Sequence, residues 1–300
     1  MKLHGAEIED TFAEAFPMWG ARVLITAATP AWALEAARSM TGFATSVIGC
    51  KCEAGIEREL APDETPDGRP GVSALLFAMD KEGVGKRLVE RVGQCVLTSP
   101  TAACFNGIEA EDTVDVGGQL RFFGDGYQAS KVLDGQRYWR VPVMEGEFLV
   151  QERFGIVEGV AGGNIIMLGR DTETALRAAE AAAGAMRSVE GAITPFPGGI
   201  ARSGSKVGSR YSGLMASTNN ALCPTLRAQV PDTDVPPGVG SVLEIVIDGL
   251  TVEAVSDAMA RGLEAAAQAG ASHVTAGNYG GNLGPYHIAL KDLVPGAGNH

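Results

Sequence analysis

The sequence has few of the residues from which metal centres and covalent catalytic sites are built. Its five cysteines are an odd number at irregular intervals, which predicts free, mostly buried thiols in a reducing compartment. Cys50-x-Cys52 lacks a second pair of ligands, so we expect no zinc or other metal site. No Ser-His-Asp or Cys-His spacing indicates covalent catalysis. The four histidines show no ligand spacing: His4, His273, His287 and His300.

Positive charge and long apolar runs are also scarce. The 24 lysines and arginines are outnumbered by 36 aspartates and glutamates, which leaves a net charge of −12. Such a surface argues against nucleic acid or an anionic membrane as a partner. No apolar run approaches the roughly 18 residues of a membrane span. The polar start Met1-Lys2-Leu3-His4 predicts no signal peptide, so we expect a cytoplasmic protein.

Aromatic residues make up only 6% of the chain, whereas 40 of its 300 residues are glycine. This composition predicts many tight turns and close backbone approaches. The hydrophobic content of 45% is ordinary and supports a substantial core.

The order strand, helix, strand, strand, helix, strand occurs twice along the chain. The first copy is expected to comprise strand 22–29, a helix from Pro30 to Thr41-Gly42, strand 43–49, strand 72–79, helix 81–93 and strand 95–98. The second is expected to comprise strand 164–168, helix 172–188, strand 190–194, strand 241–247, helix 251–269 and strand 272–276. A βαββαβ unit forms a ferredoxin-like sheet with both helices on one face. The sequence therefore predicts an α+β protein with two ferredoxin-like lobes.

Three segments stand outside this repeat. Residues 105–162 are expected to form an antiparallel β insertion, with strands at 120–123, 138–141 and 148–150 and a turn at Asp134-Gly135. Residues 53–71 are charged and rich in proline and glycine, which predicts a loop. Residues 10–20 are expected to form a short amphipathic element that packs on a partner. We expect an N-terminal lobe with the insertion over residues 1–150, a C-terminal lobe over residues 151–294 and a tail over residues 295–300.

The most informative residue is Glu244, a carboxylate inside the apolar strand 241–247. Both faces of that strand are otherwise apolar, and an unpaired buried charge would cost several kcal/mol. Burial without a cation raises a carboxyl pKa, so Glu244 could act as a proton-bearing hydrogen-bond donor near neutral pH. The alternative is an edge strand on which Glu244 lies in water or pairs with an arginine.

Polar, glycine-rich loops follow the strands of the second copy. Loops of this kind expose backbone N–H groups and small polar side chains, which suits an elongated polar ligand. Each could instead reflect turn chemistry alone, and none has the order of a phosphate-binding loop. The residues that we expect to bind substrate are Phe196, Pro197, Gly198, Gly199, Ser205, Lys206, Ser217, Thr218, Asn219, Asn278, Gly280 and Gly281.

A second candidate lies in the insertion, where two aromatic residues precede a tight turn and a third follows it. The side chains of Phe123, Asp125, Tyr127 and Gln128 could line a slot for a flat ligand. They could equally anchor the core of a hairpin.

Segments along almost the whole chain resemble one enzyme family. They are Glu7 to Phe16, Ala21 to Ala28, Glu64 to Val72, Phe122 to Gln128, Pro195 to Ile200, Glu244 to Ile247 and Ala276 to Gly281. In these segments the sequence is similar to formylmethanofuran:tetrahydromethanopterin formyltransferases.

The resemblance implies reversible transfer of a formyl group between the amine of methanofuran and N5 of tetrahydromethanopterin. It implies two ferredoxin-like lobes, a homotetramer built from dimers, no prosthetic group and no metal. The buried glutamate of the family falls on Glu244, which would assist the tetrahedral intermediate. Two settings fit: an archaeal stand-alone enzyme acting toward the formyl-pterin, and a bacterial complex with hydrolase subunits that releases formate, which we favour. A non-catalytic assembly subunit and a formyl hydrolase are the competing functions.

Overall fold

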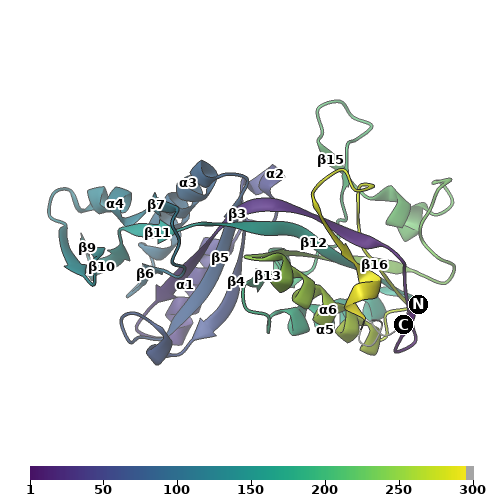
Figure 1. Ribbon diagram of the computed structural model, residues 1–300, viewed down its shortest axis with the longest axis horizontal. Helices are drawn as coiled ribbons and strands as arrows, with labels where there is room; N and C mark the ends of the chain where they lie inside the picture. Colours follow the sequence, from purple (N-terminus) through teal and green to yellow (C-terminus); the bar gives the residue numbers. More distant parts are fainter. Residues whose placement is uncertain (295–300) are drawn as a thin grey trace.

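Two lobes lie side by side along the long axis of the molecule (Figure 1). This computed structural model describes residues 1–294, so the expected tail at 295–300 lies outside the described residues. The strands form one large, mostly antiparallel sheet and two small two-stranded sheets. The expected class, α+β with two ferredoxin-like lobes and an antiparallel β insertion, is confirmed.

The N-terminal lobe follows the expected βαββαβ order. Its elements are β3 (Phe12–Thr26), α1 (Pro30–Thr41), β4 (Glu53–Leu60), β5 (Gly71–Ala78), α3 (Lys81–Arg91) and β6 (Ala103–Asn106). The strands lie in the order β4-β5-β3-β6. Thr29 caps α1 by accepting a hydrogen bond from the backbone of Trp32, and Pro30 occupies the first turn as expected.

The C-terminal lobe repeats this topology. Its elements are β12 (Val157–Gly169), α5 (Thr172–Met186), β13 (Ala192–Ile193), β16 (Ser241–Gly249), α6 (Val252–Gln268) and β17 (His273–Thr275). The strands lie in the order β17-β12-β16-β13. Asp171 and Thr251 cap the two helices, and Gly270 follows α6 in the left-handed conformation.

The long strands β3 and β12 join the two lobes, because Phe16 to Gly20 of β3 pair antiparallel with β12. The first half of β3 therefore reaches the C-terminal lobe, where Ala13 and Ala15 enter the core. The first half of β3 also pairs with β18 (Tyr286–Ala289), which η7 (Leu290–Leu293) follows. The short strand β1 (Lys2–Leu3) pairs with β2 (Ala6–Ile8), and β2 pairs with β17. The proposed boundary at residue 150 remains a prediction.

The insertion extends the N-terminal lobe at one end of the molecule (Figure 1). Its elements are β7 (Thr113–Asp115), α4 (Gly117–Leu120), η3 (Arg121–Gly124), β8 (Ala129–Leu133), β9 (Gln136–Val143), β10 (Gly146–Gln151) and β11 (Arg153–Gly155). The turn at Asp134-Gly135 joins β8 and β9, with φ of 50° and 80°, as a two-residue hairpin requires. The strand expected at 120–123 is wrong, because this segment forms helical turns stabilised by Arg121 stacking on Trp139.

Four further expectations for the first half are wrong. The charged segment 53–60 is strand β4, since Glu57 is neutralised by Arg22 of β3. Residues 43–49 contain an isolated bridge at Thr45 and the start of the short helix α2 (Val47–Cys50) instead of a strand. Residues 95–98 cover the end of η2 (Val92–Val96), a π-helical extension of α3, and the turn that follows it. Residues 12–20 belong to β3.

The remaining short elements lie in connections. They are η1 (Pro62–Glu64), η4 (Pro197–Gly199), β14 (Lys206–Val207), β15 (Ala216–Ser217), η5 (Asn220–Leu222) and η6 (Pro224–Leu226).

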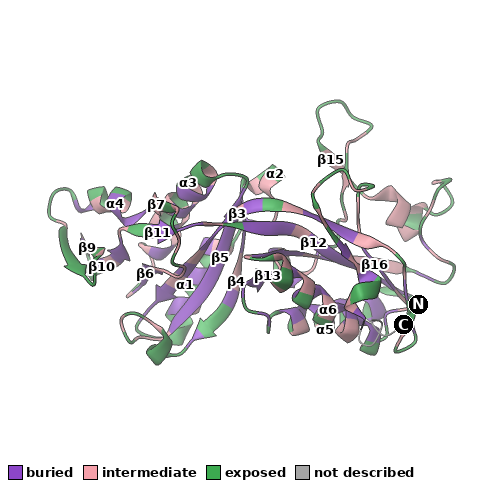
Figure 2. Cartoon of the chain, viewed as in Figure 1, coloured by how far each residue is buried: buried purple, intermediate pink, exposed green. Residues whose placement is uncertain are grey.

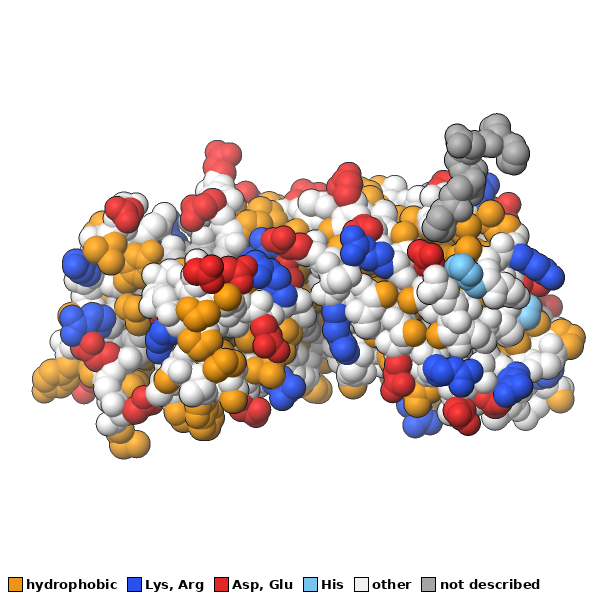
Figure 3. Space-filling view, turned by 90° about the horizontal axis from the view of Figure 1, so that it is seen from below, with side chains coloured by type: hydrophobic (Ala, Val, Ile, Leu, Met, Phe, Trp, Pro, Cys, Tyr) orange, Lys and Arg blue, Asp and Glu red, His pale blue; other side chains and the backbone are white. Residues whose placement is uncertain are grey.

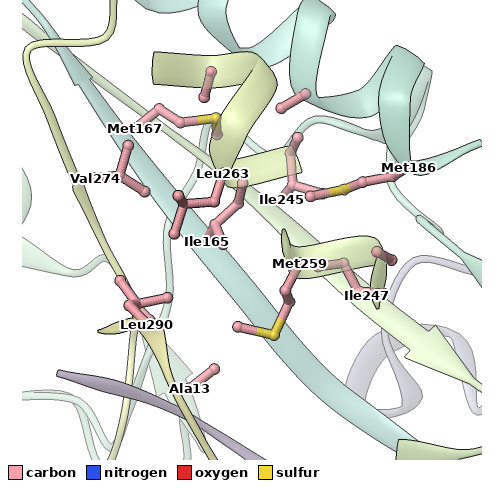
Figure 4. Packing of buried hydrophobic residues seen from close by; sticks show 14 of the residues in the cluster. Ala13, Ile165, Met167, Met186, Ile245, Ile247, Met259, Leu263, Val274 and Leu290 are labelled. Atoms are coloured by element: carbon pink, nitrogen blue, oxygen red, sulfur yellow. The ribbon is translucent and has the colours of Figure 1, made fainter. Parts of the chain in front are cut away.

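Each lobe has its own core between its helices and one face of the sheet (Figure 2). In the C-terminal lobe, Ile165 and Ile245 pack with Met259 and Leu263 of α6 (Figure 4). The helices contribute mainly alanine to this contact, which lets them lie close to the sheet. The opposite face of the same strands is covered in part by the segment 194–240, which connects β13 to β16.

Candidate functional site

Glu244 lies on the face of β16 that is turned away from the helices. The neighbouring residues Leu243 and Ile245 contact the helix-side core, so the side chain of Glu244 is directed to the other face. In the sheet Glu244 lies opposite Ile166 of β12, and Ile166 in turn lies opposite Thr275 of β17. On its other side the backbone of Glu244 exchanges two hydrogen bonds with Ala201. β16 is therefore not an open edge at this point.

The carboxyl group of Glu244 has no cation beside it. Among the ion pairs of residues 1–294, none involves Glu244. Burial raises the pKa of this carboxyl to about 7. Glu244 can therefore hold a proton in the neutral pH range and donate it in a hydrogen bond.

Glu244 lines a cavity of about 1210 Å³ along β16. The walls are β16 itself, the flank of α5 and the segment that follows β13. A second cavity of about 770 Å³ lies toward the N-terminal lobe, lined by residues of α1, β4 and β13. Phe196, Pro197 and Gly198 line both cavities. The turn expected to bind substrate thus separates two adjoining spaces.

The loop Gly277–Gly284 follows β17 and is fixed to the sheet by polar side chains. Asn164 of β12 accepts a hydrogen bond from the backbone N–H of Gly277 at 2.6 Å and donates one to its carbonyl at 3.0 Å. Asn278 donates to Thr11 and to the carbonyl of Phe12. The loop is therefore held by β12 on one side and by the start of β3 on the other.

Glu14 of β3 makes the strongest attachment of this loop. Its side chain is buried, and its carboxylate accepts hydrogen bonds from the backbone N–H groups of Tyr279, Gly281, Leu283 and Gly284. Burial acts to raise the pKa of Glu14, but these four hydrogen bonds bring it below its ordinary value. Glu14 is thus a stable anion, unlike Glu244.

The loop carries one tyrosine, Tyr279, whose side chain is partly exposed. Burial raises the pKa of the Tyr279 hydroxyl, and the negative charges of Glu244 and then Glu14 raise it further. The phenol therefore stays protonated at neutral pH and can donate a hydrogen bond.

The structure places the other expected substrate-binding residues in three different positions. Asn219 lines the cavity of Glu244, and Gly199 lines the second cavity. Ser205, Lys206, Ser217 and Thr218 lie at or beside the β14–β15 hairpin, where Lys206 donates to Asn220. Asn278, Gly280 and Gly281 belong to the loop held by Glu14.

The insertion that carries the aromatic group lies at the end of the molecule opposite β16 (Figure 1). Phe123 lines a separate cavity with Pro142 and Phe148. Phe123 and Tyr127 are exposed, so they are not anchors of a hairpin core. Within one subunit this group does not meet Glu244, and its ligand role remains a prediction.

Three residues in or beside the Gly277–Gly284 loop were not assigned a role from the sequence: Glu14, Asn164 and Tyr279. Glu14 carries the same signal as Glu244, because it is a carboxylate in the otherwise apolar strand segment Ala13 to Phe16. Asn164 and Tyr279 give no comparable signal, since an amide or phenol next to a glycine-rich loop is ordinary. In the part of the chain that the structure describes, no three His, Cys, Asp or Glu side chains form a metal-binding group.

Comparisons with known proteins give one consistent family. The family model for formylmethanofuran-tetrahydromethanopterin formyltransferase matches residues 1–143, and the model for the proximal lobe of the same family matches residues 146–293. The formylmethanofuran–tetrahydromethanopterin formyltransferase of Methylococcus capsulatus is 56% identical, over 98% of this chain and 100% of its own. A component of the formyltransferase/hydrolase complex of Methylorubrum extorquens is 54% identical, over 97% of both chains.

Solved structures agree with the sequence relatives. The formyltransferase from Methanosarcina barkeri superposes with a TM-score of 0.94 at 50% identity, covering 98% of this chain and 100% of its own. A structure of the formyltransferase/hydrolase complex from Methylorubrum extorquens with methylofuran gives 0.95 at 53% identity, covering 98% of both chains. The chain therefore belongs to the formylmethanofuran–tetrahydromethanopterin formyltransferase family and is a transferase enzyme.

Proposed function

We propose that this protein transfers a formyl group reversibly between the amine of methanofuran and N5 of tetrahydromethanopterin, with Glu244 as the catalytic acid. The observation that carries the proposal is the carboxyl group of Glu244, half-buried in a large cavity with a pKa of about 7 and no cation beside it. The two coenzymes are the substrates that the names of the family's members give.

The chemistry of formyl transfer requires such a group. The acceptor nitrogen attacks the formyl carbon, and the electrons of the C=O bond move to the oxygen. Collapse of this tetrahedral intermediate breaks the bond to the donor nitrogen, which takes up the proton that the acceptor nitrogen loses. A protonated Glu244 aimed at the oxygen stabilises its negative charge, and one such donor contributes about 3 kcal/mol. The remaining acceleration comes from holding both nitrogens near the carbon.

The two adjoining cavities support a two-substrate site. Both are walled by Phe196, Pro197 and Gly198, and only the first contains Glu244. We place the formyl carbon against Glu244 and the two coenzymes on either side of this turn. Gly199 and Asn219 would contact substrate from the same segment, with Ser205, Lys206, Ser217, Thr218, Asn278, Gly280 and Gly281 contributing from the neighbouring loops.

We further propose that the protein acts as a homotetramer, a dimer of dimers, inside a bacterial formyltransferase/hydrolase complex in the cytoplasm. Large hydrophobic side chains are exposed on the 207–215 arm, at Val207, Tyr211, Leu214 and Met215. Figure 3 shows further hydrophobic patches along another face. A relative at 54% identity is named as a subunit of such a complex. Phe123, Asp125, Tyr127 and Gln128 could complete an active site only across a contact between subunits. Among residues 1–294, no helix is long and apolar enough to cross a membrane.

The decisive experiment measures formyl exchange between formylmethanofuran and tetrahydromethanopterin, with the purified chain alone and with its natural partner subunits. We expect exchange in both directions without added metal. Glu244→Ala should lower kcat by a factor of about 100 to 1,000, which corresponds to about 3 kcal/mol.

Two outcomes would contradict the proposal. No exchange in any assembly would exclude a formyltransferase. Unchanged turnover of the complex with Glu244→Ala would favour a non-catalytic assembly subunit.

A further inference from the structure

A short segment of the C-terminal lobe, residues 191–201, connects the N-terminal lobe to the strand of Glu244. At the end of this segment, the backbone of Ala201 donates a hydrogen bond to that of Glu244 at 2.8 Å and accepts one from it at 3.0 Å. At its start, the backbone N–H of Gly191 donates to Oε1 of Glu57 on β4 at 2.6 Å. The segment is therefore fixed to the N-terminal lobe at one end and to β16 at the other.

Strand β4 contacts this segment a second time, through a glycine. Gly55 lies two residues before Glu57, and a Cβ at Gly55 would lie 3.0 Å from Cβ of Ile193 and 3.3 Å from its Cδ1 and Cγ2. Ile193 is also buried against residues of β3, β5 and β12, so it has no space into which to retreat. The absence of a side chain at Gly55 thus lets β13 lie directly against β4. We call the two contacts, Gly55–Ile193 and Glu57–Gly191, the seam between the lobes.

The seam lies beside the second cavity, because Gly55 and Ile193 both line it. Three residues beyond Ile193 the chain enters the turn at residues 196–199, whose members Phe196, Pro197 and Gly198 separate the two cavities. A proline on either side of Phe196 restricts the backbone between β13 and this turn. A shift of β13 away from β4 is therefore passed on to the turn and changes the width of the second cavity.

The other side of the turn is held by the C-terminal lobe alone. Arg187 of α5 donates a hydrogen bond to the carbonyl of Gly198 at 3.1 Å, and Ala201 is paired with Glu244. Neither contact involves β4. A change at the seam should therefore alter the second cavity and leave the surroundings of Glu244 in the first cavity as they are.

We propose that Gly55 is a positioning residue for formyl transfer: by leaving room for Ile193 at the seam, it sets the place of the turn at residues 196–199 and so the width of the second cavity, where one of the two coenzymes binds. This inference rests on the proposed function, which places one coenzyme on each side of that turn. Gly55 acts through Ile193 and the turn that follows it. Glu57 holds the neighbouring Gly191 and so keeps the start of β13 in place.

Gly55→Ala and Gly55→Val form a graded test, because both place new atoms against Ile193 and Val places more of them. Gly55 does not have a positive φ, so its backbone accepts a side chain. The matched control is Gly49→Ala in α2, where a Cβ would meet nothing within 4 Å. Gly49 lines neither cavity.

Steady-state kinetics, in the assembly in which the wild-type protein is active, separate positioning from a general loss of structure. We expect the KM for one coenzyme to rise at least threefold in Gly55→Ala and at least tenfold in Gly55→Val. The KM for the other coenzyme should stay within twofold of the wild-type value, as should both values in Gly49→Ala. A merely weakened fold would reduce the amount of active enzyme, and with it the apparent kcat, without changing either KM.

A second substitution tests whether the added side chain acts through β13 or fills the cavity itself. Ile193→Val removes Cδ1, one of the three atoms that a Cβ at Gly55 would meet. The double variant Gly55→Ala/Ile193→Val should therefore recover part of the affinity that Gly55→Ala loses, so the two effects are not additive. A side chain that only occupied the cavity would show no recovery, and that result would overturn the inference.

Unchanged KM values for both coenzymes in Gly55→Val would also overturn the inference, as would equal increases in both. Calorimetric binding of each coenzyme alone separates this inference from the proposed function. A wild-type protein without formyl exchange, in which Gly55→Val still weakens the binding of one coenzyme tenfold, would contradict the proposed function. It would retain the role of Gly55 in shaping the second cavity.

Discussion

At the scale of single residues, this protein contains two carboxylates in apolar strands with opposite properties. The carboxylate of Glu14 accepts four hydrogen bonds from backbone N–H groups, which lower its pKa. The carboxyl group of Glu244 has no ion-pair partner among the described residues, and burial raises its pKa to about 7. The difference lies in the surroundings, because each residue stands in a similar apolar strand context in the sequence. One carboxylate organises structure and the other is available for chemistry.

The first prediction concerns the pH dependence of turnover. If protonated Glu244 is the active form, kcat should be constant below its pKa and fall tenfold per pH unit as pH rises beyond about 7. Glu244→Gln cannot titrate but keeps an N–H donor, so its rate should not decline in this range and should exceed that of Glu244→Ala. The measurement is kcat from about pH 5.5 to 8.5 with both coenzymes saturating. A wild-type profile that rises through pH 7 would show that the ionised form acts instead.

At the scale of elements, the sequence patterns predicted the limits of the helices more accurately than those of the strands. The limits of α1, α5 and α6 agree with the sequence within about two residues, since their caps are local signals in the chain. Strand β4 was mistaken for a loop, because the charge of Glu57 becomes acceptable in a strand only through the distant partners Arg22 and Gly191. The extent of β3 was missed for the same reason, as its first half is completed by β12 and β18.

The second prediction concerns the contact between α6 and β12. A Cβ at Gly163 would lie 2.3 Å from Cγ1 of the buried residue Val255, so Gly163→Ala should destabilise the protein by about 1–3 kcal/mol. Gly184 of α5 is exposed and has open space at its Cβ position, so Gly184→Ala should stabilise it by roughly 0.5–1 kcal/mol. Thermal unfolding of both variants measures these effects. Equal changes would refute a packing role for Gly163.

At the scale of the whole molecule, buried carboxylates connect the two lobes. Glu57 of β4 accepts two hydrogen bonds from Arg22, one from Ser73 and one from the backbone of Gly191 in the C-terminal lobe. Burial acts to raise the pKa of Glu57, but these partners lower it below its usual value. Its contribution to stability is therefore present above the ordinary carboxyl pKa and lost as pH falls through the folded value.

The second connection between the lobes is the pair Asp248 and Glu53, whose contribution to stability depends on pH in the opposite direction. Burial raises the pKa of Asp248 on β16 and of Glu53 on β4, and the neighbouring Glu53 raises that of Asp248 further. If both groups are ionised, they have no proton and cannot form a hydrogen bond with each other. Among residues 1–294, Asp248 Oδ2 is the buried side-chain atom without a hydrogen-bond partner. A single shared proton satisfies both groups. The stability that this pair contributes is complete below the ordinary carboxyl pKa and is lost as pH rises through the raised values.

The third prediction follows from this pair. The folded protein retains this proton, whereas the unfolded chain releases it. The free energy of unfolding of the wild-type protein should therefore fall by up to about 1.4 kcal/mol per pH unit between about pH 5 and 8. The amide of Asp248→Asn supplies a permanent hydrogen-bond donor to Glu53, so the stability of this variant should fall less over this range. The loss of stability at acidic pH, which Glu57 sets, should be the same as in the wild type. Unfolding midpoints at several pH values measure the change in stability at acidic and at neutral pH, with Glu158→Gln, whose native side chain is exposed, as the control. Parallel curves for Asp248→Asn and wild type would exclude the shared proton.

The sequence by itself determined the repeat, the two lobes, the excess of acidic residues and the unusual position of Glu244, because these depend on periodicity, caps, composition and a charge in an apolar strand. Only the tertiary structure decided which strands pair across the lobes, where β4 lies, and which glycine-rich loops reach Glu244. It also decided that Glu14 is ionised and that Glu53 and Asp248 share a site. The physical reason is that a buried charge is tolerated only through its partners, and those partners come from segments up to 270 residues apart in the chain.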